Sequence, residues 1–148
     1  MLSVENVTSG YGRIQALHGV SLTVAAGEIV TLVGANGAGK TTLIRAISGV
    51  QPISGGRIVF EDRCIDRIPA HARVALGIAQ VPEGRQLFAP LSVEDNLKLG
   101  ASPIEGSSSR SSRGFAISAR PIASICCWPP DNMPEVAPRR AASIGNSA

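Results

Sequence analysis

One stretch of eight residues constrains this chain more than any other. Gly34-Ala-Asn-Gly-Ala-Gly-Lys40-Thr41 fits the pattern G-x-x-x-x-G-K-[ST], a loop that wraps backbone N–H groups around phosphates. The apolar run Glu28–Val33 before it predicts a buried strand, and Thr41–Ser48 after it predicts a helix. The sequence therefore predicts an α/β core whose P-loop binds the phosphates of a nucleotide.

The residue types in the loop suit a triphosphate, which needs many donors in a small space. The three loop glycines lack a Cβ, so the backbone can take unusual dihedral angles and point its N–H groups inward. The following helix aims its N-terminus at the same point. Lys40 is expected to reach the β- and γ-phosphates, and the Thr41 hydroxyl to ligate a bridging Mg²⁺. Thr42 can add a further hydroxyl contact to a phosphate.

Composition and charge set wider limits. The 148 residues suit one modest domain, and 44% hydrophobic residues are enough for a core. The net charge of +3 comes from scattered residues without a basic run, so no nucleic-acid partner is expected. No stretch reaches the roughly 18 apolar residues of a membrane helix, and the first residues lack signal-peptide character. A cytoplasmic protein is expected, with Cys64, Cys126 and Cys127 as incidental thiols.

Strands and turns are expected to alternate ahead of the P-loop. Leu2–Val7 alternates apolar and polar residues, which predicts a half-exposed strand, and Gly19–Val24 predicts a second strand. Ser9–Gly12 is expected to form a turn. Gly27 is expected to supply the positive φ of a tight turn into the P-loop strand. The pattern predicts an antiparallel start followed by the α/β core.

The segments after the P-loop helix are shorter. Ser54–Arg57 is expected to be a turn and Ile58–Phe60 a strand. A short helix is predicted over residues 68–76, and a buried strand over Gly77–Val81. Ser92–Asp95 has the form of a capping box that opens another helix. Beyond this point, residues 105–148 are rich in Ser, Arg and Pro without a strand or helix period, which predicts a disordered tail.

Two residues outside the P-loop narrow the class of nucleotide-binding protein. Tyr11 lies upstream, where an aromatic face can stack on adenine, and Gln80 ends the strand Gly-Ile-Ala-Gln80. The order of aromatic residue, P-loop and glutamine resembles the ATP-binding subunits of ABC transporters and argues against a soluble P-loop enzyme such as a kinase. The resemblance implies that Tyr11 stacks on the base. It also implies that Gln80 is the Q-loop residue, which touches Mg²⁺ and the attacking water.

Longer phrases resemble one branch of that family. Tyr11–Val20, Gly27–Asn36, Gly77–Arg85 and Leu91–Leu97 look like the ATPase subunits of branched-chain amino-acid (Liv-type) importers. The resemblance covers about residues 1–104. It implies a partial ABC-type ATP-binding domain, the N-terminal portion of a P-loop NTPase with an antiparallel β subdomain, ahead of the tail at 105–148.

The resemblance also implies ligands and partners. The chain is expected to bind ATP and Mg²⁺, to pair with a second ATPase subunit and to drive a membrane permease from the cytoplasmic face of the membrane. The implied magnesium ligands are Thr41 and Gln80. The implied nucleotide-binding residues are Tyr11, Gly34, Asn36, Gly37, Ala38, Gly39, Lys40, Thr41 and Thr42. The amino-acid cargo follows from similarity alone, because the ATPase subunit does not touch it.

Three catalytic elements of the family have no counterpart in this sequence. They are the L-S-G-G-Q-type signature, the Walker B strand that ends in Asp and Glu, and the switch histidine. Asp131 and Glu135 follow no apolar strand. His18 and His71 are not placed as a switch and are interpreted as surface or packing residues. Hydrolysis is therefore not expected of the chain as given, and the P-loop strand is expected to lack a neighbour in the sheet.

Two hypotheses for the tail stay open. It is either an out-of-frame segment, because the resemblance ends abruptly inside a helical region, or a genuine divergent tail. One choice of codons for Pro130–Val136 yields a signature-like Gly-Gln-Tyr-Ala-Gly-Gly in a shifted frame. Two functions stay open as well. The chain is either an ATP-binding subunit of an amino-acid importer, or a nucleotide-binding fragment or pseudogene product that does not hydrolyse.

Overall fold

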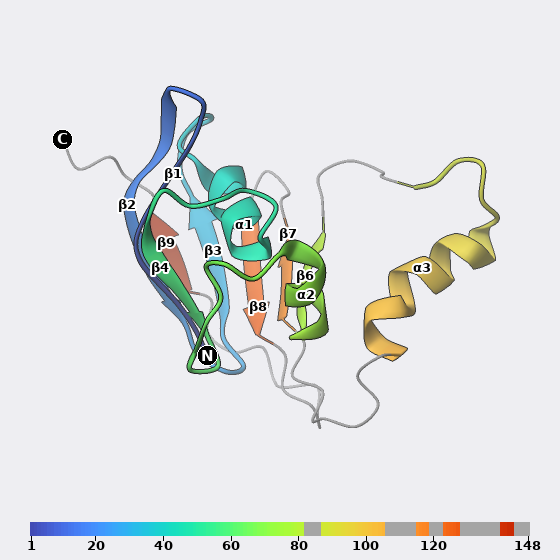
Figure 1. Cartoon of the computed structure of the whole chain (residues 1–148). Coiled ribbons are helices and arrows are strands. Elements are labelled where there is room, and N and C mark those ends of the chain that lie inside the picture. Colours follow the sequence, from blue (N-terminus) through green and yellow to red (C-terminus); the bar gives the residue numbers. More distant parts are fainter. Residues whose placement is uncertain (82–86, 106–114, 119–122, 128–139, 144–148) are drawn as a thin grey trace.

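The computed structural model describes residues 1–81, 87–105, 115–118, 123–127 and 140–143, and it places two sheets beside a central helix (Figure 1). The first sheet has the strand order β2-β1-β4-β5, and the second has the order β6-β7-β8-β3-β9. The elements of the first sheet are β1 (Leu2–Tyr11), β2 (Ile14–Val24), β4 (Gly55–Phe60) and β5 (Arg63–Cys64). Those of the second are β3 (Ile29–Val33), β6 (Ile78–Val81), β7 (Phe115–Ser118), β8 (Ala123–Cys127) and β9 (Arg140–Ser143). The helices are α1 (Lys40–Ser48), α2 (Ala70–Ala75) and α3 (Val93–Glu105).

One apolar core joins α1 to both sheets. The helix contributes four buried apolar residues, Leu43, Ile44, Ala46 and Ile47. They share a cluster with β1 residues of the first sheet and with Val30 and Leu32 of the second. Because the apolar face of α1 packs into this shared cluster, the core fixes α1 between the sheets and the P-loop at its N-terminus.

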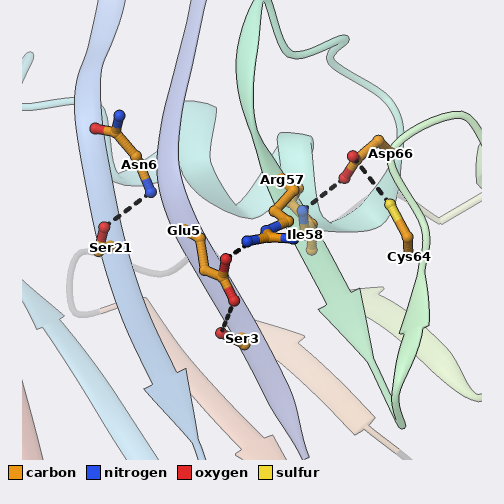
Figure 2. Close-up of polar contacts among 8 residues, drawn as sticks. All are labelled: Ser3, Glu5, Asn6, Ser21, Arg57, Ile58, Cys64 and Asp66. Carbon is orange, nitrogen blue, oxygen red and sulfur yellow. Dashed lines mark hydrogen bonds and ion pairs between the residues drawn. The ribbon is translucent and has the colours of Figure 1, made fainter.

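The first sheet is antiparallel throughout, as the alternation in β1 predicts. Figure 2 shows polar side chains that connect β1 and β4: the Arg57 guanidinium donates to the Glu5 carboxylate. The Asp66 carboxylate accepts a hydrogen bond from the Ile58 N–H, and the Cys64 thiol lies 3.0 Å from its second oxygen. The Glu5–Arg57 pair is well exposed, so it adds little stability.

Two predicted turns are strands instead. Ser9 continues β1 to Tyr11, because its buried hydroxyl is satisfied by donating to the Pro52 carbonyl at 2.7 Å. The strand β4 already begins at Gly55, inside the predicted turn 54–57. Its second residue, Gly56, lies so close to the Asn6 carbonyl that a Cβ would collide with it. Glycine here serves close strand packing at a bulge and does not mark a turn.

The second sheet contains strands from the C-terminal part of the chain, and it corrects the expectation that the P-loop strand lacks a neighbour. Three segments of 105–148 are the strands β7, β8 and β9, and the rest beyond Glu105 lies outside the described residues. The P-loop strand β3 also has two neighbours, β8 antiparallel and β9 parallel. Buried backbone N–H and C=O groups must be paired. Runs of four or five residues can supply those partners although they are too short to show a periodic pattern.

The helices α2 and α3 lie where the sequence predicts them. Pro69 precedes α2, and the Ser92 hydroxyl caps α3 by accepting a hydrogen bond from the Asp95 N–H at 3.1 Å. The Asn96 amide oxygen accepts a hydrogen bond from the Phe88 N–H at 2.9 Å, which fixes the entry to α3. In Figure 1, α3 stands apart from the two sheets.

Candidate nucleotide-binding site

The P-loop connects β3 to α1, and two of its glycines have left-handed backbone conformations with positive φ. Gly37 has φ 86° and Gly39 has φ 89°. A Cβ on Gly39 would lie 2.6 Å from the Ala16 carbonyl oxygen and 2.8 Å from Leu17 Cδ2, whereas a Cβ on Gly37 would meet nothing. Gly39 is therefore needed where the loop presses on β2. Gly37 leaves its backbone open to a ligand.

Lys40 lies across the mouth of this loop. Its Nζ donates to the Gly34 and Ala35 carbonyl oxygens, each at 2.8 Å. The bonds close the loop on itself and keep a positive charge beside its N–H groups. The Lys40 ammonium group is therefore held against the backbone of the loop.

Tyr11 lies at the first turn of α1. The Thr42 side chain hydrogen-bonds to the phenol and lowers its pKa from the ordinary value of 10.0; partial burial opposes this shift, and Arg45 adds to it. Thr42 is buried, while 45% of the Tyr11 surface remains exposed. Thr41 is half-buried one residue earlier. An aromatic side chain, two hydroxyls and a lysine therefore gather around one end of the helix.

A cleft of about 490 Å³ runs beside the loop. One wall is the P-loop from Ala35 to Ala38, which includes the predicted residues Asn36 and Gly37. The other wall comes from Gln15, Ala16 and His18 of β2. Ligand pockets commonly span roughly 300–1,000 Å³, so the cleft has the size of a small-molecule site.

Gln80 does not join this group. Its Oε1 accepts a hydrogen bond of 2.6 Å from the Ser48 hydroxyl, at the last residue of α1. Thr41 lies seven residues earlier in that helix, about 10 Å away along the axis. The structure thus does not bring the two predicted magnesium ligands together. The order of the motifs predicts that Gln80 faces the phosphates. That order does not reveal Ser48, the partner that fixes the Gln80 side chain, because the two residues are 32 positions apart.

Sequence reasoning missed Arg73, which closes the same end of α1. Its Nη1 donates to the Ala46 and Ile47 carbonyls at 2.8 and 2.9 Å. Its Nε donates to Ile68 O at 2.7 Å and its Nη2 to Asp66 O at 3.1 Å. Burial lowers the pKa of this guanidinium, and the charge of Asp66 opposes the shift. No local pattern separates this arginine from one on the surface of a short helix.

Asp131 and Glu135 lie outside the described residues. Within the described residues, no three His, Cys, Asp or Glu side chains group as metal ligands. No helix there has the length and apolar character needed to cross a membrane. His71 and His18 are both exposed, and His18 is the one that lines the cleft.

Comparison with known proteins assigns the family. A family model described as ABC transporter matches residues 17–139. The chain belongs to the ABC transporter family. The fold agrees, because a nucleotide-free ATP-binding cassette from an ABC transporter superposes with a TM-score of 0.63 at 30% identity, over 74% of this chain and 46% of that one. The ADP conformation of such a cassette gives a TM-score of 0.61 at 30% identity, with 74% and 45% covered.

Individual relatives are similar over about two thirds of the chain. The high-affinity branched-chain amino acid transport ATP-binding protein BraG of Pseudomonas aeruginosa is 48% identical over 100 residues, which are 68% of this chain and 43% of BraG. The lipopolysaccharide export system ATP-binding protein LptB of Escherichia coli is 43% identical over 96 residues, 65% of this chain and 40% of LptB. The chain thus spans less than half the length of these curated relatives.

Proposed function

We propose that this chain binds ATP with Mg²⁺ at the P-loop and is the ATP-binding part of an ABC importer. The observation that carries the proposal is the group at the N-terminal end of α1. There the left-handed glycines open the loop backbone, Lys40 lies on the loop carbonyls and Tyr11 reaches Thr42. Each of these groups suits a different part of a nucleoside triphosphate.

The phosphates would be held by the loop. The N–H groups of residues 34–39 and of the first turn of α1 are donors for the phosphate oxygens. In the bound state, Lys40 exchanges its two carbonyl acceptors for the β- and γ-phosphates, at little cost in hydrogen bonds. Asn36 and Ala38, which line the cleft, contribute further backbone contacts.

The hydroxyls and the aromatic ring complete the site. Thr41 offers the hard oxygen ligand that Mg²⁺ prefers, so its hydroxyl would hold a magnesium ion, which would supply positive charge to the phosphates. Thr42 fixes the Tyr11 phenol, and this bond orients the ring for stacking on the base. Gln80 takes no part in this site, since its side chain is bound at the other end of α1.

Similarity supports a narrower role in branched-chain amino-acid import. BraG shares 48% of its aligned residues with this chain, against 43% for LptB, whose printed function is lipopolysaccharide export. The proposed partners are a membrane permease and a second ATPase subunit, at the cytoplasmic face of the membrane. Because the ATPase part does not touch the cargo, this assignment depends on the identity to BraG.

A second candidate is a chain that binds the nucleotide without hydrolysing it. The sequence favours it, because it holds no run of four apolar residues followed by Asp and Glu. Without such a carboxylate, no general base would activate water at the γ-phosphate.

Calorimetric titration of the full chain with Mg-ATP tests the proposal. We expect saturable binding that weakens about tenfold or more in Lys40→Ala, because charged hydrogen bonds to phosphate are lost. Lys98→Ala, an exposed lysine on α3, is the matched control and should leave affinity unchanged. Absence of binding by the unaltered chain would contradict the proposal. Release of phosphate that Lys40→Ala abolishes would rule out the second candidate alone.

A further inference from the structure

Two polar side chains line the β2 wall of the cleft, Gln15 and His18. Gln15 already donates from Nε2 to the Leu17 carbonyl at 3.1 Å, and Ala16 has no polar side-chain atom. His18 is exposed, and no described residue forms a hydrogen bond or ion pair with it. An imidazole carries at least one N–H donor in either protonation state. The wall opposite the P-loop therefore offers the ligand the imidazole of His18 and, beside Ile14, the second N–H of the Gln15 amide.

The position of His18 along β2 indicates which part of the ligand it faces. Tyr11, the proposed partner of the base, pairs with Ile14 at the tip of the β1–β2 hairpin. His18 lies four residues farther along the strand, about 13 Å from Ile14. It shares the cleft with Ala35, whose carbonyl accepts a hydrogen bond from Lys40. The base end of the site is thus at the hairpin tip, and His18 lies toward the lysine end.

We propose that the His18 imidazole donates a hydrogen bond to the terminal phosphate of a bound nucleoside triphosphate. The inference rests on the proposed nucleotide site and adds a residue to it. A triphosphate is one phosphoryl group longer than a diphosphate, so with the base on Tyr11 it would extend farther toward His18. His18 therefore raises affinity for the triphosphate over the diphosphate, while the P-loop binds both.

The test compares Mg-ATP and Mg-ADP affinities of the full chain by calorimetry. His18→Ala is expected to weaken Mg-ATP binding about fivefold, the size of one ordinary hydrogen bond, and to change Mg-ADP binding by less than about twofold. His18→Gln keeps an N–H donor and is expected to recover most of the loss. Thr23→Ala, an exposed position on the same strand outside the cleft, is the control and should bind both nucleotides unchanged.

The outcomes separate this inference from the proposed function. If the unaltered chain binds neither nucleotide, the site itself is wrong and the role of His18 falls with it. If it binds both but His18→Ala leaves the ratio of the two affinities unchanged, only the role of His18 is wrong. Circular dichroism melts of each variant verify that the folded state is being compared, and His18→Gln decides the question should His18→Ala fail to fold.

Discussion

The two ends of α1 are built for opposite purposes. At the N-terminal end the P-loop is exposed, and Lys40 bonds to loop carbonyls that a phosphate can replace. At the C-terminal end the carbonyls of Ala46 and Ile47 accept hydrogen bonds from buried Arg73, and the Ser48 hydroxyl bonds to Gln80. Every helix leaves unpaired donors at its start and unpaired acceptors at its end.

The contrast explains how a short helix can serve as a fixed anion site. Arg73 of α2 donates to the carbonyl acceptors at the far end, and Gln80 of β6 accepts a hydrogen bond from the Ser48 hydroxyl, so that end is held in place. The donors at the near end stay available to a ligand, where the positive end of the helix dipole favours phosphate. Gln80 therefore belongs to the support of the site and not to the site itself. Changes at the far end should lower stability, and changes at the near end should alter binding.

The largest effect is expected at Arg73. Arg73→Ala leaves four carbonyl oxygens without their buried donor and should lower the free energy of unfolding by about 4 kcal/mol. Urea denaturation measures the loss. The control, Arg67→Ala, removes an exposed arginine of the same region and should change the free energy of unfolding by less than about 0.5 kcal/mol. Equal stability of the two variants would show that Arg73 does not close the helix.

The P-loop glycines should differ from one another. Gly37→Ala should lower the free energy of unfolding by about 1 kcal/mol, the strain of an alanine in a left-handed conformation, because its Cβ meets open space. Gly39→Ala adds a collision with the Ala16 carbonyl and should cost about 3 kcal/mol. Thermal unfolding followed by circular dichroism compares them. A Gly37 variant as unstable as the Gly39 variant would mean that the loop does not press on β2 as described.

The Ser48–Gln80 bond gives a smaller and more selective effect. A double-mutant cycle with Ser48→Ala and Gln80→Ala should show a coupling of about 1 kcal/mol in urea denaturation. The affinity for Mg-ATP should change by less than about twofold in Gln80→Ala, since this side chain lies away from Thr41. A large loss of magnesium-dependent binding in that variant would return Gln80 to the nucleotide site.

The smallest effect concerns the Tyr11 phenol, the only tyrosine in the chain. Its pKa is lowered below 10.0, chiefly by the Thr42 hydrogen bond, so the folded chain favours the phenolate. The pKa of the Tyr11 phenol is about 10 in the unfolded chain and lower in the folded chain. This contribution to stability is therefore complete above pH 10 and is lost as the pH falls through the pKa of the folded chain. Near-ultraviolet absorbance should show the titration midpoint rising toward 10.0 in Thr42→Val. An unchanged midpoint would place the phenol elsewhere.

Sequence alone predicts the near end of α1 well and the far end poorly. The P-loop is a local pattern, in which glycine, lysine and threonine stand at fixed spacings that only one geometry uses. The strand before it and the helix after it follow from apolar runs of sufficient length. Arg73 and Gln80 take their roles from residues 26 to 32 positions away. No single-sequence pattern encodes such pairings.

The strands show the same limit. Ser9 and Gly55 have turn-forming character, yet both lie in strands because their neighbours satisfy a hydroxyl or need close packing. The segments β7, β8 and β9 are four or five residues long and pair with strands far away in sequence. Short apolar runs in a polar tail can be identified, but their partners depend on the fold of the rest of the chain.

The central claim is that nucleotide binds one end of α1 and leaves the other untouched. Two-dimensional amide NMR of the full chain during titration with Mg-ATP tests it most directly. The account predicts large shift changes for residues 34–42 together with Tyr11 and His18, and small ones for Ser48, Arg73 and Gln80. Changes centred on Ser48 and Gln80, or none at the P-loop, would contradict it.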